Sequence, residues 1–329
     1  MKILAFGEVM MRLNPANFKK ITQTDQLDMS FTGTGLNILA GLAVNGYQTS
    51  LLTALPANNL GRAASASVRK LGVNDQPLVF SGQHLGVYLL EMGYGGRPSE
   101  VTYLDRSQSA FNQVVLTDDV INQALVGIEM VHICGIALST SIISRQNALR
   151  VARLAAAKKI PLCFDFNFRA SLNTETDRES LRACYHEILS SASIVFGSLR
   201  DLTELLLISG EDDQAIVQKF MNDFDIKYFG GTIRHKTVEK SELQGYLYSG
   251  GNEVVVSDKV SYQTYDRIGT GDAYVSGILT GLIEQWTLQD TVNFATYNAA
   301  LAHTTYGDSP VLSKEFVLNY IKNKIDVIR

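Results

Sequence analysis

The hydrophobic pattern of this 329-residue chain alternates short apolar runs with longer helical patterns. The runs 130–134 (Met-Val-His-Ile-Cys) and 193–196 (Ser-Ile-Val-Phe) are nearly continuous, which is typical of parallel strands covered by helices on both faces. The stretches 141–159 and 177–191 have the length and spacing of helices. This β-α-β rhythm predicts an α/β fold, with helices layered on both sides of a mostly parallel central sheet.

Two early regions interrupt the rhythm and indicate a second, smaller sheet. In 84–107, the apolar stretches 86–92 and 100–104 flank a turn rich in glycine and proline, and no helix follows. This is a β-hairpin pattern. We expect a small antiparallel β lid, contributed by about residues 10–33 and 84–107, to project from the main domain.

The last third of the chain has three helical patterns, at 271–285, 288–305 and 313–324, and Ser313 is placed to cap the third. The length alone allows one large α/β domain or two smaller ones. Because the chain shows no internal repeat and no long linker, we favour a single domain over residues 1–329 with the lid appended.

Composition narrows the class of partner. With 33 acidic and 29 basic side chains, the net charge of −4 gives no reason to expect a nucleic acid or an acidic membrane as partner, so a small molecule is expected. No stretch approaches the ~20 apolar residues of a membrane span, and we expect a cytoplasmic protein. The cysteines at 134, 163 and 184 form no C-x-x-C pair and are interpreted as buried thiols.

The segment 266–277 carries the clearest chemistry. Gly269 and Gly271 stand directly before a predicted helix whose first turn contains Asp272. Glycines allow close approach of the backbone, and the N–H groups at a helix start bind anions. An aspartate there could be an ordinary helix cap. Phosphoryl transfer to an alcohol, however, needs an anion hole and a carboxylate that accepts the hydroxyl proton, and this segment supplies both.

The same segment, Asp266-Arg-Ile-Gly-Thr-Gly-Asp, resembles the D-x-x-G-A-G-D motif of the PfkB carbohydrate kinases. The resemblance extends over the whole chain and implies a ribokinase-like fold. It also implies an enzyme that uses ATP and Mg²⁺ to phosphorylate a sugar. It implies that Asp272 is the general base and that Gly269, Thr270 and Gly271 form the anion hole. Thr270 replaces the usual alanine, which should leave the backbone donors unaffected.

The sugar side has its own markers. Residues 33–37, Gly-Thr-Gly-Leu-Asn, resemble the family's G-G-x-x-x-N element, which implies that Gly33 and Asn37 line the sugar pocket. A plain loop into an amphipathic helix would explain the glycines but not an asparagine in an otherwise apolar helix. The Gly307-Asp308 tail also resembles these kinases and implies that Asp308 contacts substrate hydroxyls.

Four more residues resemble those with which 2-keto-3-deoxygluconate kinases hold their acid sugar: Tyr88, Tyr103, Arg106 and Arg169, the last within Asp-Phe-Asn-Phe-Arg. A sugar acid presents a carboxylate, which arginine and tyrosine donors bind through charge-assisted hydrogen bonds. In the simpler alternative, the tyrosines are a cross-strand aromatic pair and the arginines are solvated strand ends.

The nucleotide side departs from the family pattern. Where many relatives have N-x-x-E, this chain has Ser198 and Asp201, so part of that role could remain, but we predict no protein metal ligand. The resemblance places Thr232 and Arg234 at phosphate or ribose and Asn298 beside the adenine. An ordinary glycine turn and a polar helix face explain these residues equally well.

The resemblance thus predicts a kinase that converts 2-keto-3-deoxygluconate to its 6-phosphate. Two alternatives stay open: a kinase for fructose, tagatose or a dehydrodeoxygluconate isomer, and a sugar sensor that keeps the fold without catalysis. Also open are a K⁺ or Na⁺ ion near the Asp266 loop, as in some relatives, and a homo-oligomer formed through the lid.

Overall fold

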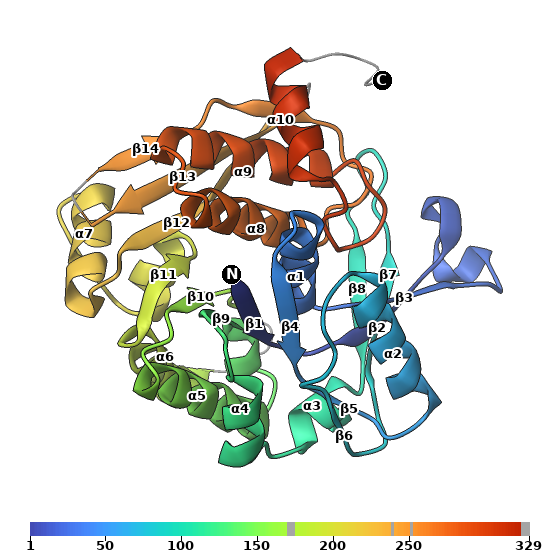
Figure 1. Ribbon diagram of the computed structural model, residues 1–329. Coiled ribbons are helices and arrows are strands. Elements are labelled where there is room, and N and C mark those ends of the chain that lie inside the picture. Colours follow the sequence, from blue (N-terminus) through green and yellow to red (C-terminus); the bar gives the residue numbers. More distant parts are fainter. Residues whose placement is uncertain (170–174, 238–239, 251–252, 324–329) are drawn as a thin grey trace.

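The structure is a computed structural model that describes residues 1–169, 175–237, 240–250 and 253–323. Within this part of the chain, nine strands form the central sheet: β1 (Lys2–Phe6), β4 (Gln48–Leu52), β9 (Met130–Cys134), β10 (Leu162–Asp165), β11 (Ala192–Phe196), β12 (Tyr228–Lys236), β13 (Ser241–Ser249), β14 (Val254–Val256) and β15 (Val260–Tyr262). The order is β14-β13-β12-β11-β10-β9-β1-β4, and β15 also pairs with β13 (Figure 1).

The central sheet is mostly parallel, as predicted. The neighbours from β4 through β1, β9, β10 and β11 to β12 all pair in parallel, whereas β13 pairs antiparallel with β12, β14 and β15. The carboxyl ends of the parallel strands therefore meet along one edge of the sheet. In open α/β sheets this is the edge at which ligands bind.

Helices cover both faces of the central sheet (Figure 1). One face packs against α1 (Thr34–Val44), α8 (Thr270–Ile283) and α9 (Leu288–Ala302), and α10 (Lys314–Asn323) lies on α9. The other packs against α4 (Asp118–Ala124), α5 (Ile142–Ala157), α6 (Glu175–Leu189) and α7 (Asp213–Phe224). The chain also forms α2 (Asn59–Lys70), α3 (Ala110–Gln113) and the short strand pair β5 (Ala54–Leu55) and β6 (Val79–Phe80).

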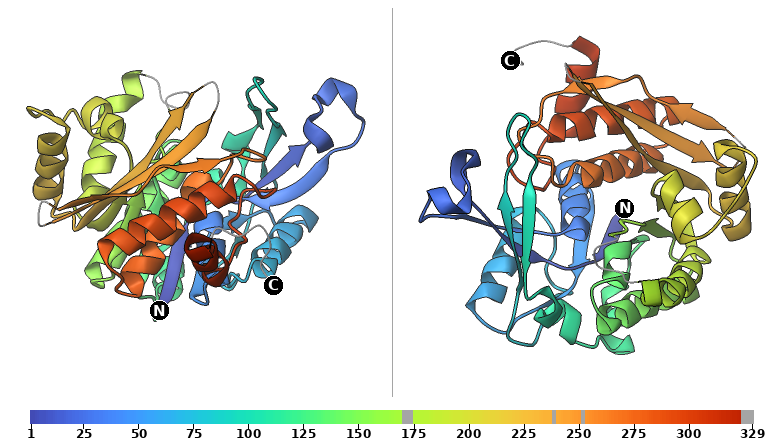
Figure 2. Two further views of the ribbon diagram at one scale, coloured as in Figure 1. Left: turned by 90° about the horizontal axis from the view of Figure 1, so that it is seen from above. Right: turned by 180° about the vertical axis from the view of Figure 1, so that it is seen from behind.

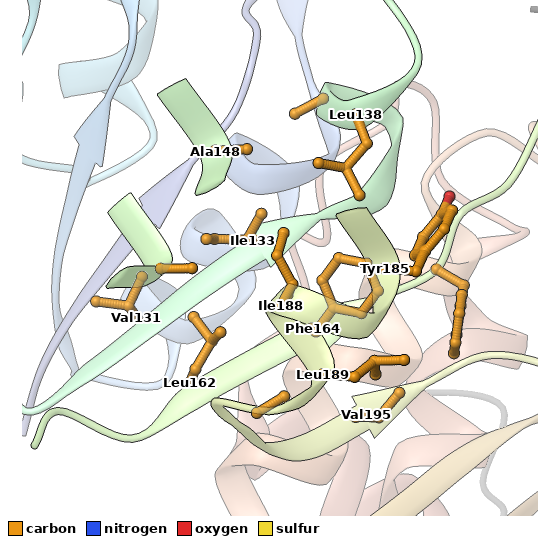
Figure 3. Close-up of a cluster of buried hydrophobic side chains, with 14 of the residues drawn as sticks. Val131, Ile133, Leu138, Ala148, Leu162, Phe164, Tyr185, Ile188, Leu189 and Val195 are labelled. Atoms are coloured by element: carbon orange, nitrogen blue, oxygen red, sulfur yellow. The ribbon is translucent and has the colours of Figure 1, made fainter. Parts of the chain in front are cut away.

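Alternate residues of the buried strands feed two separate hydrophobic cores. In β1, Leu4 and Phe6 point into the core beneath α4 to α7, whereas Ile3 and Ala5 point into the core beneath α1, α8 and α9. Figure 3 shows the first core, where side chains of β9, β10 and β11 meet those of α5 and α6. Burial on both faces explains why these strands are continuous apolar runs in the sequence.

A second, four-stranded sheet projects to one side of the main body (Figure 2). We call it the small sheet; it consists of β2 (Met10–Asn14), β3 (Asp28–Thr32), β7 (Gly86–Glu91) and β8 (Glu100–Leu104), in the order β3-β2-β7-β8. Each of its two hairpins is antiparallel, and they join through the parallel pair β2 and β7. Both regions that break the helix rhythm of the sequence thus form one sheet.

Predicted and observed boundaries differ by a few residues. For example, α9 ends at Ala302 rather than at residue 305. Helix α1 begins at Thr34 and includes Asn37. Ser313 caps α10 as predicted, because its hydroxyl accepts a hydrogen bond from the Phe316 N–H at 3.2 Å. Among the described residues, no helix has the length and apolar character required to cross a bilayer.

Candidate active site

A cleft of about 970 Å³ opens at the carboxyl edge of the parallel strands, between this edge and the small sheet. Its walls come from strand ends of the central sheet, from the start of α8 and from the small sheet. Of the site residues predicted from the sequence, those that line it are Gly33, Asn37, Tyr88, Tyr103, Arg106, Arg169, Ser198, Thr232, Arg234, Gly269, Thr270, Gly271, Asp272 and Asp308. Residues as far apart as 33 and 308 therefore share one cavity.

The start of α8 has the geometry of an anion site. Gly269 is the N-cap and has φ 77°, a left-handed conformation that favours glycine. A Cβ on Gly269 would overlap the carbonyl oxygen of Asp308, whereas a Cβ on Gly271 would meet no atom within 4 Å and would project into open space. The first glycine allows two loops to touch, and the second keeps space beside the helix amides for a ligand.

Asp272 lies in the first turn of α8, where it lines the cleft and is only 7% exposed. Its carboxylate accepts a hydrogen bond from the Asn37 amide at 2.7 Å. Burial raises the pKa of Asp272 well above its ordinary value, although the hydrogen bond from Asn37 lowers it. A carboxylate with a raised pKa is a better proton acceptor, which suits a general base.

Asn37 is held in place by α1 and its neighbours. The side-chain oxygen of Asn37 accepts a hydrogen bond from the Ser309 hydroxyl at 3.0 Å and lies 3.1 Å from the Thr32 hydroxyl, which leaves the amide directed at Asp272. Gly33, the N-cap of this helix, packs so closely on the backbone of Glu8 that a Cβ would overlap the Glu8 carbonyl oxygen. Asn37 thus contacts the predicted base as well as the cleft.

A buried ionic network that the sequence did not predict is centred on Arg12. The Arg12 side chain is fully buried, and its guanidinium donates to the carboxylates of Asp308 and, at 2.6 Å, of Asp266. Burial alone would lower the pKa of Arg12, but the Asp308 and Asp266 carboxylates raise it above its ordinary value. Thr32 and Tyr88 donate to the other Asp308 oxygen at 2.8 and 2.6 Å. Three side chains, Arg12, Thr32 and Tyr88, therefore donate to the Asp308 carboxylate.

The tyrosines of the small sheet form the cross-strand pair that the sequence left open. Tyr88 and Tyr103 are register partners on β7 and β8, with ring centroids 6.2 Å apart. Tyr88 is buried and bonded to Asp308, whereas Tyr103 is 45% exposed and lies 5.2 Å from the Arg106 guanidinium. Both line the cleft, so this packing and a contact with substrate are compatible.

Arg106 has a buried acidic partner that sequence reasoning also missed. Its Nε donates to Glu8 at 2.7 Å, and the other Glu8 oxygen accepts from Ser109 at 2.7 Å and from Asn112 at 3.3 Å. Glu8 lies two residues beyond the end of β1, at the carboxyl edge of the parallel strands where ligands bind. This position after a predicted strand is a signal that could have identified it. The ion pair fixes the orientation of Arg106 at the cleft.

Arg169 follows β10 at the carboxyl edge and lines the same cleft. Asp165, at the end of β10, has a pKa raised to about 6 by burial. Its carboxylate accepts a hydrogen bond from the N–H of Asn167 at 3.1 Å, and this residue has a positive φ of 37°. The Asp-Phe-Asn-Phe-Arg segment is thus a tight turn that brings acidic and basic groups to the cleft.

On the predicted nucleotide side, Asp201 accepts hydrogen bonds from the N–H and the hydroxyl of Ser198, at 2.7 and 2.8 Å. Burial raises the pKa of Asp201 above its ordinary value. On β12, Arg234 donates to the Thr270 hydroxyl at 3.1 Å, and this hydroxyl donates to the Arg267 carbonyl at 3.1 Å. The threonine that replaces alanine therefore joins β12 to the start of α8.

Asn298 is the predicted site residue that the structure does not bring to the cleft. Its side chain is buried and donates to the carbonyl of Ala273 at 2.8 Å, a helix-to-helix contact between α9 and α8. The placement does not support a contact with adenine. Within the described residues, no group of three or more histidine, cysteine or acidic side chains is arranged to hold a metal ion.

The cleft combines a buried carboxylate of raised pKa, helix amides that can bind an anion, and several arginines, which together suit phosphoryl transfer to an alcohol. Comparisons with known proteins agree. The profile of the pfkB family carbohydrate kinases matches residues 1–315. A structure from Enterococcus faecalis, provisionally assigned as a 2-keto-3-deoxygluconate kinase, is 44% identical with a TM-score of 0.96, over 100% of this chain and 99% of that one.

Other relatives carry related names. The structure of the 2-dehydro-3-deoxygluconokinase from Thermotoga maritima is 27% identical with a TM-score of 0.90, over 98% of this chain and all of that one. The 2-dehydro-3-deoxygalactonokinase of Haloferax volcanii is 26% identical over 96% of this chain and 95% of its own length. The 5-dehydro-2-deoxygluconokinase of Clostridium beijerinckii is 25% identical over 98% of this chain and 94% of its own length.

Proposed function

Since the chain belongs to the pfkB family of carbohydrate kinases, we propose that it uses ATP and Mg²⁺ to phosphorylate the primary hydroxyl of 2-keto-3-deoxygluconate, giving the 6-phosphate. The observation that carries the proposal is the position of Asp272. It is a buried cleft carboxylate in the first turn of α8, beside the amides of Gly269 to Gly271. The proposed general base and the proposed anion hole thus belong to one continuous segment of the chain, residues 269–272.

In the proposed reaction, the sugar oxygen forms a bond to the γ-phosphorus as the bond from this phosphorus to the bridging oxygen of ADP breaks. The hydroxyl proton passes to Asp272, whose raised pKa favours its acceptance. The amides at the start of α8 stabilise the charge on the transferred phosphoryl group. Asn37 keeps the carboxylate in position through its 2.7 Å hydrogen bond.

Magnesium, when bound, neutralises charge on the nucleotide phosphates. The ion usually keeps several waters and is held by one or two carboxylates together with phosphate oxygens. Asp165 and Asp201 suit this requirement, because both are cleft carboxylates whose pKa is raised by burial and which a nearby cation would stabilise. We propose that Asp165 and Asp201 are the residues that would hold the ion beside the nucleotide phosphates.

The arginines support a sugar acid over a neutral sugar. Arg106 and Arg169 line the cleft on the side of the small sheet and of β10, where a substrate carboxylate could accept from both. The three sugar names carried by the relatives are all keto-deoxy acids, in keeping with this chemistry. They also define the alternatives, namely the galactonate-derived epimer and 5-dehydro-2-deoxygluconate, in addition to fructose and tagatose.

We further propose that the small sheet acts as a lid on one kinase domain that spans the whole chain. Tyr88, Tyr103 and Arg106 reach the cleft from this sheet or directly after it, so closure would exclude water from the transferred phosphoryl group. The edge strand β8 carries exposed apolar side chains on both faces, Val101 and Tyr103 on the cleft side and Leu104 on the other, so we propose the lid as the place where a second copy would pack.

The decisive experiment is ADP release by the purified protein with ATP and Mg²⁺, comparing 2-keto-3-deoxygluconate, its galactonate epimer, 5-dehydro-2-deoxygluconate, fructose, ribose and no sugar. Turnover that requires a keto-deoxy acid supports the proposal. Turnover with fructose or ribose but with no keto-deoxy acid would contradict the proposal that the cleft arginines bind a substrate carboxylate. Binding of sugar without ADP release would favour the sugar sensor.

Arginine variants test the substrate assignment directly. Loss of a charged hydrogen bond weakens binding by about 1.5–3 kcal/mol, so Arg169→Ala should raise KM for the sugar acid by roughly 10- to 100-fold. Because Arg106 is paired with Glu8 at 2.7 Å, Arg106→Ala needs the matched control Glu8→Gln, which keeps the arginine but removes its buried partner. Equal KM values for the acid in wild type and Arg169→Ala would exclude this role.

A further inference from the structure

We infer that Arg12 is a positioning residue that couples the small sheet to the anion hole through the carboxylates of Asp266 and Asp308. Arg12 lies on β2, is fully buried and stands behind the residues that line the cleft. Its effect on the reaction must therefore pass through other groups. The inference rests on the proposed function, because it gives Arg12 a part in aligning the α8 amides for phosphoryl transfer.

The two carboxylates belong to two loops that meet at the start of α8. Asp266 accepts hydrogen bonds from the N–H of Ile268 at 3.1 Å and from the N–H of Gly307 at 3.3 Å, so it joins the loop before α8 to the loop after α9. The backbone of Asp308 lies so close to Gly269 that no Cβ fits between them. A displacement of either carboxylate would displace the first amides of the anion hole.

The same carboxylates are held by three strands of the small sheet. Arg12 comes from β2, Thr32 from β3 and Tyr88 from β7, and all three donate to Asp308, Thr32 at 2.8 Å and Tyr88 at 2.6 Å. Tyr88 is in turn the cross-strand partner of Tyr103, which lines the cleft. One carboxylate thus joins three strands of the small sheet to the loop that packs against Gly269.

The network requires an arginine for a geometric reason. One nitrogen of the guanidinium donates to Asp266 at 2.6 Å and another donates to Asp308, while Nε donates to Asn14 at 3.2 Å. A planar fork can satisfy three acceptors in fixed directions, whereas the ammonium of lysine is a point charge. Lysine at this position would keep the charge and lose the alignment.

The test is Arg12→Lys in the full chain, assayed with whichever sugar the wild type uses best. Because Arg12 does not line the cleft, kcat should fall by about tenfold or more while KM for the sugar changes by less than about threefold. Amide hydrogen exchange should rise in the segment 266–272 and stay unchanged in the core strand β9. The matched control is Arg97→Lys, since Arg97 lies in the turn that joins β7 to β8 of the small sheet but donates to the backbone carbonyls of Phe18 and Met92.

Three results would overturn the inference: an equal loss of kcat in Arg97→Lys, a change confined to KM, or unchanged exchange in 266–272. Should Arg12→Lys fail to fold, Thr32→Val removes one donor to Asp308 and should lower kcat by about threefold to tenfold, with the same local rise in exchange. If the wild type is silent with every sugar, the proposed function fails, while the exchange measurement still decides whether Arg12 controls the loop.

Discussion

Two aspartates in this cleft are equally buried but should respond in opposite ways to the same substitution. Asp272 and Asp308 are each 7% exposed. Asp272 accepts a hydrogen bond from the neutral Asn37 amide, whereas Asp308 accepts from the Arg12 guanidinium and two hydroxyls. A buried charge without strong compensation costs several kcal/mol, and a compensated one does not.

Asp272→Asn removes the charge and keeps an oxygen that can accept from Asn37. We expect the free energy of unfolding to rise by about 1–3 kcal/mol and the Tm by about 2–5 °C at pH 8. Because the folded state holds the Asp272 proton more tightly than the unfolded chain, the gain is largest above the raised pKa and vanishes as the pH falls below about 4. Activity should fall by about 10²- to 10⁴-fold, since the base is lost.

Asp308→Asn leaves part of the Arg12 charge without its partner, so it should lower the free energy of unfolding by about 3 kcal/mol. Thermal unfolding at pH 5 and pH 8, together with ADP release, measures all of these quantities on the same samples. A lower Tm for Asp272→Asn, or a kcat within tenfold of wild type, would refute the assignment of Asp272 as an under-compensated general base.

Three further predictions follow from the same geometry. Because Arg12 donates to the Asp266 carboxylate, exchange of K⁺ for Na⁺ or tetramethylammonium at constant ionic strength should leave kcat unchanged, and a strict K⁺ requirement would contradict this. Gly269→Ala should strongly lower the Tm, since a Cβ there overlaps a neighbouring carbonyl, whereas Gly271→Ala should keep the Tm within about 2 °C and lower kcat/KM by filling the cleft. In the pH profile of kcat/KM, the acid limb should lie above about 4, the ordinary aspartate value, because protonation of Asp272 removes the base.

Much of the fold could be predicted from the sequence because its causes are local. Continuous apolar runs such as 130–134 mark strands buried on both faces, and the helices between them have their own periodicity. The glycine-rich turn between the apolar stretches 86–92 and 100–104 predicted the hairpin. The anion-hole segment was also visible, since its glycines and Asp272 are adjacent in the chain.

The ionic contacts could not be predicted in this way because their partners lie far apart along the chain. Arg12 and its two aspartates are separated by 254 and 296 residues, and Arg106 is 98 residues from Glu8. A weak signal existed in β2, where the buried positions are Met10, Arg12 and Asn14. A strand that turns its polar residues inward must meet buried partners, but the sequence does not name them.

The residues at which the chain departs from the motifs it resembles still make specific contacts in the cleft. Thr270 stands in place of alanine, and its hydroxyl links Arg234 of β12 to the carbonyl of Arg267 at the start of α8. Ser198 stands in place of asparagine, and its N–H and hydroxyl both donate to Asp201. Each substituted side chain thus makes contacts that hold cleft residues in place. Phosphoryl transfer depends on donors and carboxylates that are held in fixed positions, and these contacts hold Arg234, Thr270 and Asp201 at the cleft, so the departures are compatible with the chemistry of a kinase.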